Sequence, residues 1–106
     1  MYKPRLVHIK EQGGVKGFGF NLKVIDGNIG QIIGIVDPGS PAEAAGLRYG
    51  DRLLEVNGVN VEFCSSHSDV VRQIKSIPNE TKLLVINMDS YEHYRTSGRG
   101  YVHHWN

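Results

Sequence analysis

The chain has 106 residues, of which 40% are hydrophobic and 22% charged, and these values are typical of one globular domain. Twelve Lys and Arg residues against 11 Asp and Glu residues give a formal net charge of +1, which provides no broad basic surface for nucleic acid and no polybasic stripe for a membrane. The single cysteine, Cys64, excludes an internal disulfide and favours a reducing, cytoplasmic location.

Apolar residues in the first half of the chain predict three strands followed by one short helix. Alternating or β-branched apolar residues indicate the strands at 5–10, 19–24 and 29–36. Ser40-Pro41 is typical of a helix start, because an N-cap residue precedes a first-turn proline, and Gly46 is expected to end this helix.

The second half of the chain predicts a hairpin, a longer helix and a final strand. Asn57-Gly58 is the strongest short hairpin signal, and its two strands are expected at 52–56 and 59–61. Apolar residues recur at helical spacing from Ser66 until Pro78, so a helix is expected there. A last apolar run predicts a strand at 81–88.

The order β-β-β-α-β-β-α-β, with a short connection at almost every junction, predicts an α+β fold. We expect a small, mostly antiparallel six-stranded sheet, arranged as a partly open barrel or sandwich capped by two helices. This domain is expected to span residues 1–88. From Asp89 onward Tyr, His, Arg, Gly and Ser predominate, so 89–106 is predicted to be a polar C-terminal extension outside the core, flexible or with one weak helical turn.

Four spaced sequence motifs stand in order within a match that covers residues 4–88. They are the loop Gly17-Phe18-Gly19-Phe20, a short helix at 38–47, a hairpin at 50–58 and a second helix that opens with His67. The chain therefore resembles a PDZ domain, and phrases such as Pro38-Gly39-Ser40-Pro41-Ala42-Glu43 make it most similar to the sodium–hydrogen exchanger regulatory factor group of scaffolds. The resemblance implies a non-enzymatic adaptor domain without a cofactor, which binds C-terminal peptide tails ending in Ser/Thr-x-aliphatic.

The resemblance also implies a role for each part of a groove between the second strand and the second helix. The peptide would add an antiparallel strand to the sheet. Its carboxylate would accept backbone N–H groups, its last side chain would enter an apolar pocket, and its third-last Ser or Thr would bond to a histidine. The carboxylate donors are Phe18, Gly19 and Phe20, the pocket residues are Phe18, Phe20, Leu22, Val71 and Ile74, the strand-pairing residues are Asn21, Leu22 and Lys23, and the histidine is His67.

Two positions bear on which peptides the groove prefers. We expect a neutral His67 to accept the peptide hydroxyl, so that binding weakens as the pH falls through about 6.5, where imidazoles ordinarily titrate. Gly34 departs from the resembled group, which often carries an arginine at this place, so an acidic preference further upstream in the peptide is in doubt. Asn21 and Lys23 could partly replace that arginine.

The same residues leave other interpretations open. Cys64 and His67 could form a thiolate–imidazole pair, although no third group is evident to orient them. The histidines of the extension, His93, His103 and His104, could bind a metal adventitiously but lack the spacing of a metal site. The domain could also regulate a larger enzyme such as a protease, or the extension could dock on its own or a neighbouring core.

The resemblance implies C-terminal tails of membrane transporters, channels or receptors as partners. The module is expected to be monomeric, to bind no nucleic acid, to insert in no membrane, and to be recruited beneath the plasma membrane by its partners. The last residues, His104-Trp105-Asn106, do not suit an aliphatic pocket, so capture of the chain's own end is not expected.

Overall fold

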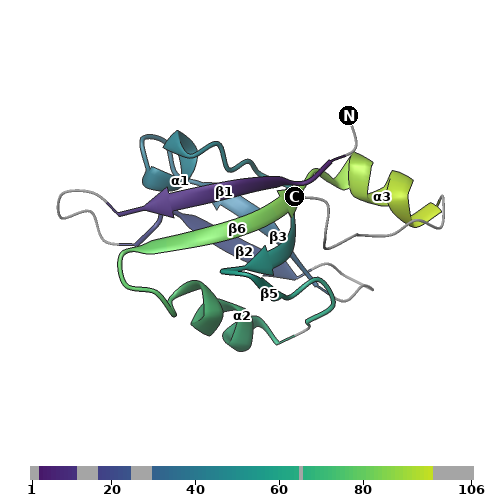
Figure 1. Ribbon diagram of the computed structural model, residues 1–106. Coiled ribbons are helices and arrows are strands. Elements are labelled where there is room, and N and C mark those ends of the chain that lie inside the picture. Colours follow the sequence, from purple (N-terminus) through teal and green to yellow (C-terminus); the bar gives the residue numbers. More distant parts are fainter. Residues whose placement is uncertain (1–2, 12–16, 25–29, 65, 97–106) are drawn as a thin grey trace.

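The structure, a computed structural model, describes residues 3–11, 17–24, 30–64 and 66–96 (Figure 1). The elements along these residues are β1 (Arg5–Lys10), β2 (Phe20–Val24), β3 (Gln31–Val36), α1 (Pro41–Ala44), β4 (Arg52–Val56), β5 (Val59–Asn60), α2 (His67–Ile74), β6 (Glu80–Ile86) and α3 (Met88–Thr96). Their order agrees with the prediction up to β6, after which a third helix follows. Gly13-Gly14 and Asp26-Gly27-Asn28 are sequences typical of turns, and both lie outside the described residues.

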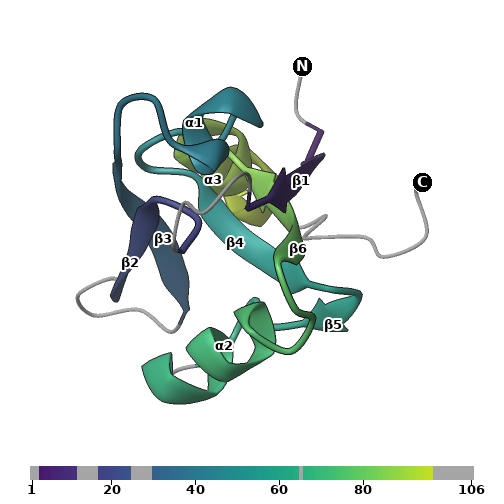
Figure 2. The ribbon, with the colours of Figure 1, turned by 90° about the vertical axis from the view of Figure 1, so that its left-hand side faces the viewer.

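The described strands form one sheet in the order β1-β6-β4-β3-β2, and β5 pairs with β4. Every pairing is antiparallel. Helices α1 and α2 lie at opposite ends of the sheet (Figure 1, Figure 2). The predicted α+β fold is therefore confirmed. Because β2 is the last strand of this path, its outer edge presents backbone N–H and C=O groups that a further strand can use.

The main core lies where the inward side chains of the strands meet α2. Ile9, Leu53 and Val85 are fully buried at inward positions of β1, β4 and β6. From α2, Val70 and Ile74 pack on this core with 0% and 5% of their surface exposed. The burial of these two side chains fixes the rotation of α2 about its axis, and it thereby fixes which neighbouring face of the helix is turned toward β2.

The segment after residue 88 differs from its prediction. The sequence predicts that residues from Asp89 onward lie outside the core with at most a weak helical turn, and this is wrong for the beginning of the segment. Helix α3 has nine residues, and Ser90 and Tyr91 are 4% and 7% exposed. Tyr91 packs with Leu54 and Ile86 in a second apolar cluster. The prediction was wrong because it used the average composition of the segment. A single aromatic side chain such as Tyr91 buries a large apolar area even when most of its neighbours are polar.

Tyr91 also joins two buried charged residues. Its hydroxyl donates to Oε2 of Glu62 at 2.7 Å, and Cζ of Arg52 lies 4.5 Å from the centre of its ring. Nη2 of Arg52 donates to the backbone carbonyl of Glu62 at 2.6 Å. Arg52 and Glu62 are each 3% exposed, and buried charged groups are costly unless they have partners. Helix α3 therefore stabilises the domain by supplying such a partner.

Tyr91→Phe removes the hydroxyl that donates to the buried Glu62 carboxyl group, and we expect the free energy of unfolding to fall by about 1–3 kcal/mol. Urea unfolding followed by circular dichroism measures the difference. Tyr49→Phe is the matched control, because Tyr49 is 66% exposed, and its effect should stay within about 0.5 kcal/mol. Equal effects of the two substitutions would contradict the stabilising role of the Tyr91 hydroxyl.

Candidate functional site

The loop Gly17-Phe18-Gly19-Phe20 is attached to the fold through its carbonyl groups. The carbonyl of Phe18 accepts the N–H of Ala42 at 2.9 Å, and the carbonyl of Gly19 accepts the N–H of Asp37 at 2.8 Å. The N–H groups of Phe18 and Gly19 donate to no acceptor among the described residues. With the carbonyls held on one side, these N–H groups remain available to an anion.

The two glycines of the loop make this arrangement sterically possible. Gly17 and Gly19 have φ values of +75° and +87°, in the left-handed region that glycine adopts without strain. A Cβ atom on Gly19 would lie 2.2 Å from Cβ of Ser40, the N-cap residue of α1. The loop therefore rests directly on the start of α1, and Gly19 has no room for a side chain.

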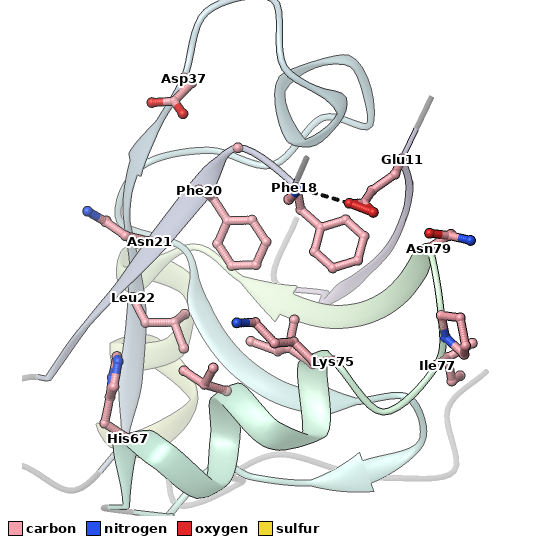
Figure 3. Close-up of a pocket in the computed structure, with 15 residues that line it drawn as sticks. Glu11, Phe18, Phe20, Asn21, Leu22, Asp37, His67, Lys75, Ile77 and Asn79 are labelled. Atoms are coloured by element: carbon pink, nitrogen blue, oxygen red, sulfur yellow. Dashed lines mark hydrogen bonds between the residues drawn. The ribbon is translucent and has the colours of Figure 1, made fainter. Parts of the chain in front are cut away.

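A groove of about 700 Å³ runs between this loop and β2 on one side and α2 on the other (Figure 3). It brings together the predicted carboxylate-binding residues Phe18, Gly19 and Phe20, the predicted pocket residues Leu22, Val71 and Ile74, and also Asn21 and His67. Lys23 does not line the groove. Apart from Lys23, the predicted site residues thus lie together in this groove, and their roles stay predictions.

The apolar part of the groove continues the main core. Phe18, Phe20 and Leu22 are partly buried and pack against that core. The rings of Phe18 and Phe20 have centroids 6.5 Å apart and planes inclined by 30°. Val71 and Ile74 face them from α2. Because these walls are supported from behind by the core, the pocket is formed before any ligand arrives.

His67, the first residue of α2, stands at the other end of the groove. Its exposed ring points from the helix toward the part of β2 that carries Leu22 (Figure 3). Nδ1 of the ring lies 3.3 Å from Oε1 of Gln31. Cys64 has a different contact, since its thiol donates to the carbonyl of Ser66 at 3.8 Å. The thiolate–imidazole pair considered from the sequence is therefore not formed.

The side chain of Asn21 occupies the space beside Gly34, where β2 pairs with β3. The pairing of these strands shifts register between Phe20 and Leu22, and Oδ1 of Asn21 accepts the N–H of Ile35 at 2.8 Å there. A Cβ atom on Gly34 would lie 2.1 Å from this Oδ1 atom. Gly34 therefore leaves room for the Asn21 side chain, which supplies an acceptor to a backbone group at the irregularity.

Lys23 lies further along β2. Its Nζ atom is 5.6 Å from the centre of the Tyr49 ring, a cation–π distance. This position is consistent with a side chain directed away from the groove, as its absence from the lining indicates. The strand-pairing role expected of Lys23 concerns its backbone and stays a prediction.

Several lining residues were not predicted from the sequence: Glu11, Asp37, Lys75, Ile77, Pro78 and Asn79. Oε2 of Glu11 accepts the N–H of Gly17 at 2.8 Å, and the N–H of Glu11 donates to the carbonyl of Asn79 at 2.9 Å. The Glu11 carboxylate therefore lies beside the available N–H groups of the loop. The amine of Lys75 reaches over the groove from the end of α2 (Figure 3). The sequence gives one indication of the two charged residues: Glu11 precedes the predicted loop, and Lys75 directly follows the predicted pocket residue Ile74.

The chain belongs to the PDZ domain family, whose model matches residues 6–86. PDZ domains bind peptides by strand addition, and the chain is accordingly a peptide-binding adaptor domain. None of the helices that the structure describes is long and apolar enough to span a membrane. In the described ranges, no three His, Cys, Asp or Glu side chains are grouped so as to hold a metal ion, and His103 and His104 lie outside those ranges.

The relatives confirm the resemblance to the exchanger regulatory scaffolds. The chain is 50% identical over 93 residues to the Na(+)/H(+) exchange regulatory cofactors NHE-RF2 of Oryctolagus cuniculus and NHE-RF1 of Gallus gallus, which is 88% of this chain but 28% and 27% of those proteins. The chain thus spans less than a third of their length. A solved PDZ domain from choanoflagellate SHANK1, bound to a GIRK3 peptide, is 40% identical with a TM-score of 0.69, covering 79% of this chain and 91% of that chain.

Glu11→Gln keeps an acceptor for the Gly17 N–H and removes a negative charge beside the loop. We expect the affinity for a peptide with a free C-terminal carboxylate to rise about two- to fivefold, because like charges at partly exposed sites typically cost a few tenths to about 1 kcal/mol. Fluorescence polarisation measures this rise, and added salt should reduce it.

Glu43→Gln is the control for this prediction. Its carboxylate also accepts a glycine N–H, that of Gly39 at 2.8 Å, but it does not line the groove. The Glu43 variant should bind within twofold of the unsubstituted chain. A lower affinity of the Glu11 variant would show instead that this carboxylate supports the loop.

Proposed function

We propose that the chain binds free C-termini ending in Ser/Thr-x-aliphatic, with the peptide added to β2 as an antiparallel strand in the groove against α2. The observation that carries this proposal is the pair of N–H groups on Phe18 and Gly19. They have no acceptor among the described residues and stand at the end of an open strand edge. An extended chain that ends in a carboxylate satisfies both the loop and the edge.

The carboxylate would accept the N–H groups of Phe18, Gly19 and Phe20. Hydrogen bonds to a charged group contribute about 1.5–3 kcal/mol each before desolvation is subtracted. The backbone groups on the outer edge of β2, from Asn21 to Lys23, would pair with the preceding peptide residues, which adds affinity with little demand on their side chains. The Lys75 amine adds positive charge above the groove.

The last peptide side chain would enter the apolar pocket next to the loop. Phe18, Phe20 and Leu22 form one wall, and Val71 and Ile74 form the other. The residues that form these two walls are apolar, so an aliphatic side chain fits best between them. Burial of a Val- or Leu-sized side chain contributes about 1.5–3 kcal/mol.

The spacing along α2 supports a role for His67 in reading the third-last peptide residue. Side chains two residues apart in a strand point the same way and are separated by about 6.8 Å. His67 and Val71 are four residues apart in one helix, a rise of about 6 Å. When the last side chain lies against Val71, the third-last side chain therefore lies near His67, where a Ser or Thr hydroxyl can bond to the ring.

The relatives support an adaptor in a larger scaffold, since the two at 50% identity are named exchange regulatory cofactors. We propose tails of membrane transporters, channels or receptors as partners, and a location beneath the plasma membrane that depends on them. The binding unit in this proposal is a monomeric module that binds without catalysis. It comprises the peptide-binding domain of residues 1–88 and the extension that follows, whose first part, α3, packs on the domain. These names do not favour the alternative of a regulatory domain in a protease.

Fluorescence polarisation with a labelled peptide ending in Thr-x-Leu tests the proposal. We expect at least a tenfold loss of affinity for the C-terminal amide, because the amide cannot replace the charge-assisted bonds to the loop. His67→Ala should reduce the preference for Thr over Val at the third-last position and keep the preference for acid over amide. Equal affinities for the acid and the amide would refute the proposed mode of binding.

A further inference from the structure

Gln31, the first residue of β3, carries a side-chain amide that the proposed peptide does not reach. The residue is 0% exposed. Burial of an amide is costly unless its polar atoms have hydrogen-bond partners. Nε2 of Gln31 has no partner among the described residues, whereas Oε1 lies 3.3 Å from Nδ1 of His67. The histidine ring is thus the partner that the structure gives to this buried amide.

This contact determines where the proton of a neutral His67 ring resides. A neutral imidazole has one N–H donor and one nitrogen with a free lone pair, and the carbonyl oxygen of an amide accepts but cannot donate. A hydrogen bond between Oε1 and Nδ1 therefore requires the proton on Nδ1. The other nitrogen, Nε2, is then left as an acceptor.

We propose that Gln31 is a positioning residue that holds His67 in the Nδ1–H tautomer and thereby makes Nε2 an acceptor for a hydroxyl donor on the peptide. This proposal rests on the proposed function, because it assigns the ring to the third-last peptide residue. Partners of a ring nitrogen commonly set the state of the opposite nitrogen in this way.

The burial of Gln31 makes the amide suited to this task. Gln31 pairs with Val24 of β2 in the sheet, so its backbone is held in the strand pair that forms one side of the groove. Its side chain has no exposed surface, so water does not compete for Oε1. The His67 ring, in contrast, is exposed toward the groove and available to a peptide. The buried Gln31 amide therefore fixes the proton on Nδ1 of His67, and this leaves Nε2 as the acceptor for the peptide.

The tautomer is measured directly by long-range ¹H–¹⁵N spectra of the full chain at about pH 8, where an ordinary imidazole is neutral. In the unsubstituted chain we expect Nδ1 of His67 to give the resonance of a protonated ring nitrogen and Nε2 that of an unprotonated one. In Gln31→Met, which has a similar size but no carbonyl, we expect the proton to shift toward Nε2. The opposite assignment in the unsubstituted chain would overturn the proposal without any variant.

Peptide binding gives a second readout. A Ser hydroxyl can donate to Nε2, whereas O-methylserine at the same position has an ether oxygen that can only accept. We expect the ratio of the two affinities to fall about three- to tenfold in Gln31→Met, the value of one hydrogen bond. An unchanged ratio would overturn the proposal.

Gln73→Met is the matched control. Gln73 lies on α2 outside the groove lining, and its Nε2 donates to Oγ of Ser76 at 3.5 Å. This substitution should alter neither the tautomer nor the ratio. The acid-over-amide preference should persist in all three proteins. Its absence would refute the proposed function, while the tautomer spectra would still decide the role of Gln31.

Discussion

Two hydrogen bonds that carbonyl groups of the loop accept decide what this loop, which leads into β2, can bind. The carbonyl oxygens of Phe18 and Gly19 accept the N–H groups of Ala42 and Asp37, and these bonds hold the loop in place. The N–H groups of Phe18 and Gly19 consequently donate to no acceptor among the described residues. Gly19 is the residue on which this depends, because a Cβ atom at its position would overlap Ser40. The proposed carboxylate site is therefore formed by backbone groups and is supported by α1 behind it.

The core also holds in place the residues of α2 to which the proposal assigns peptide specificity. Helix α2 buries Val70 and Ile74, and this fixes the adjacent positions of His67 and Val71 along β2. Gln31 then acts on His67 from the buried side. In the proposed mode of binding, both the affinity for a peptide C-terminus and the selectivity among C-termini therefore depend on core residues that are already packed before the peptide binds.

Local rules account for most of what the sequence could predict. The short helix after Ser40, the hairpin at Asn57-Gly58 and the helix that begins after Ser66 depend on near neighbours along the chain, and each lies where the sequence predicts it. The loop and groove residues were expected instead from the resemblance to PDZ domains. The missed features join distant residues. Tyr91 meets Glu62, and His67 meets Gln31, across separations of 29 and 36 residues. Such contacts follow from the assembled sheet and not from periodicity or composition.

The central claim, that the N–H groups of the loop receive a peptide carboxylate, is tested most directly by amide resonances of the ¹⁵N-labelled chain. Addition of a peptide ending in Thr-x-Leu should move the amide protons of Phe18 and Gly19 strongly downfield, as charge-assisted hydrogen bonds do. The same peptide with an amidated end should leave them nearly in place. Saturation by the free acid without displacement of these two resonances would contradict the account.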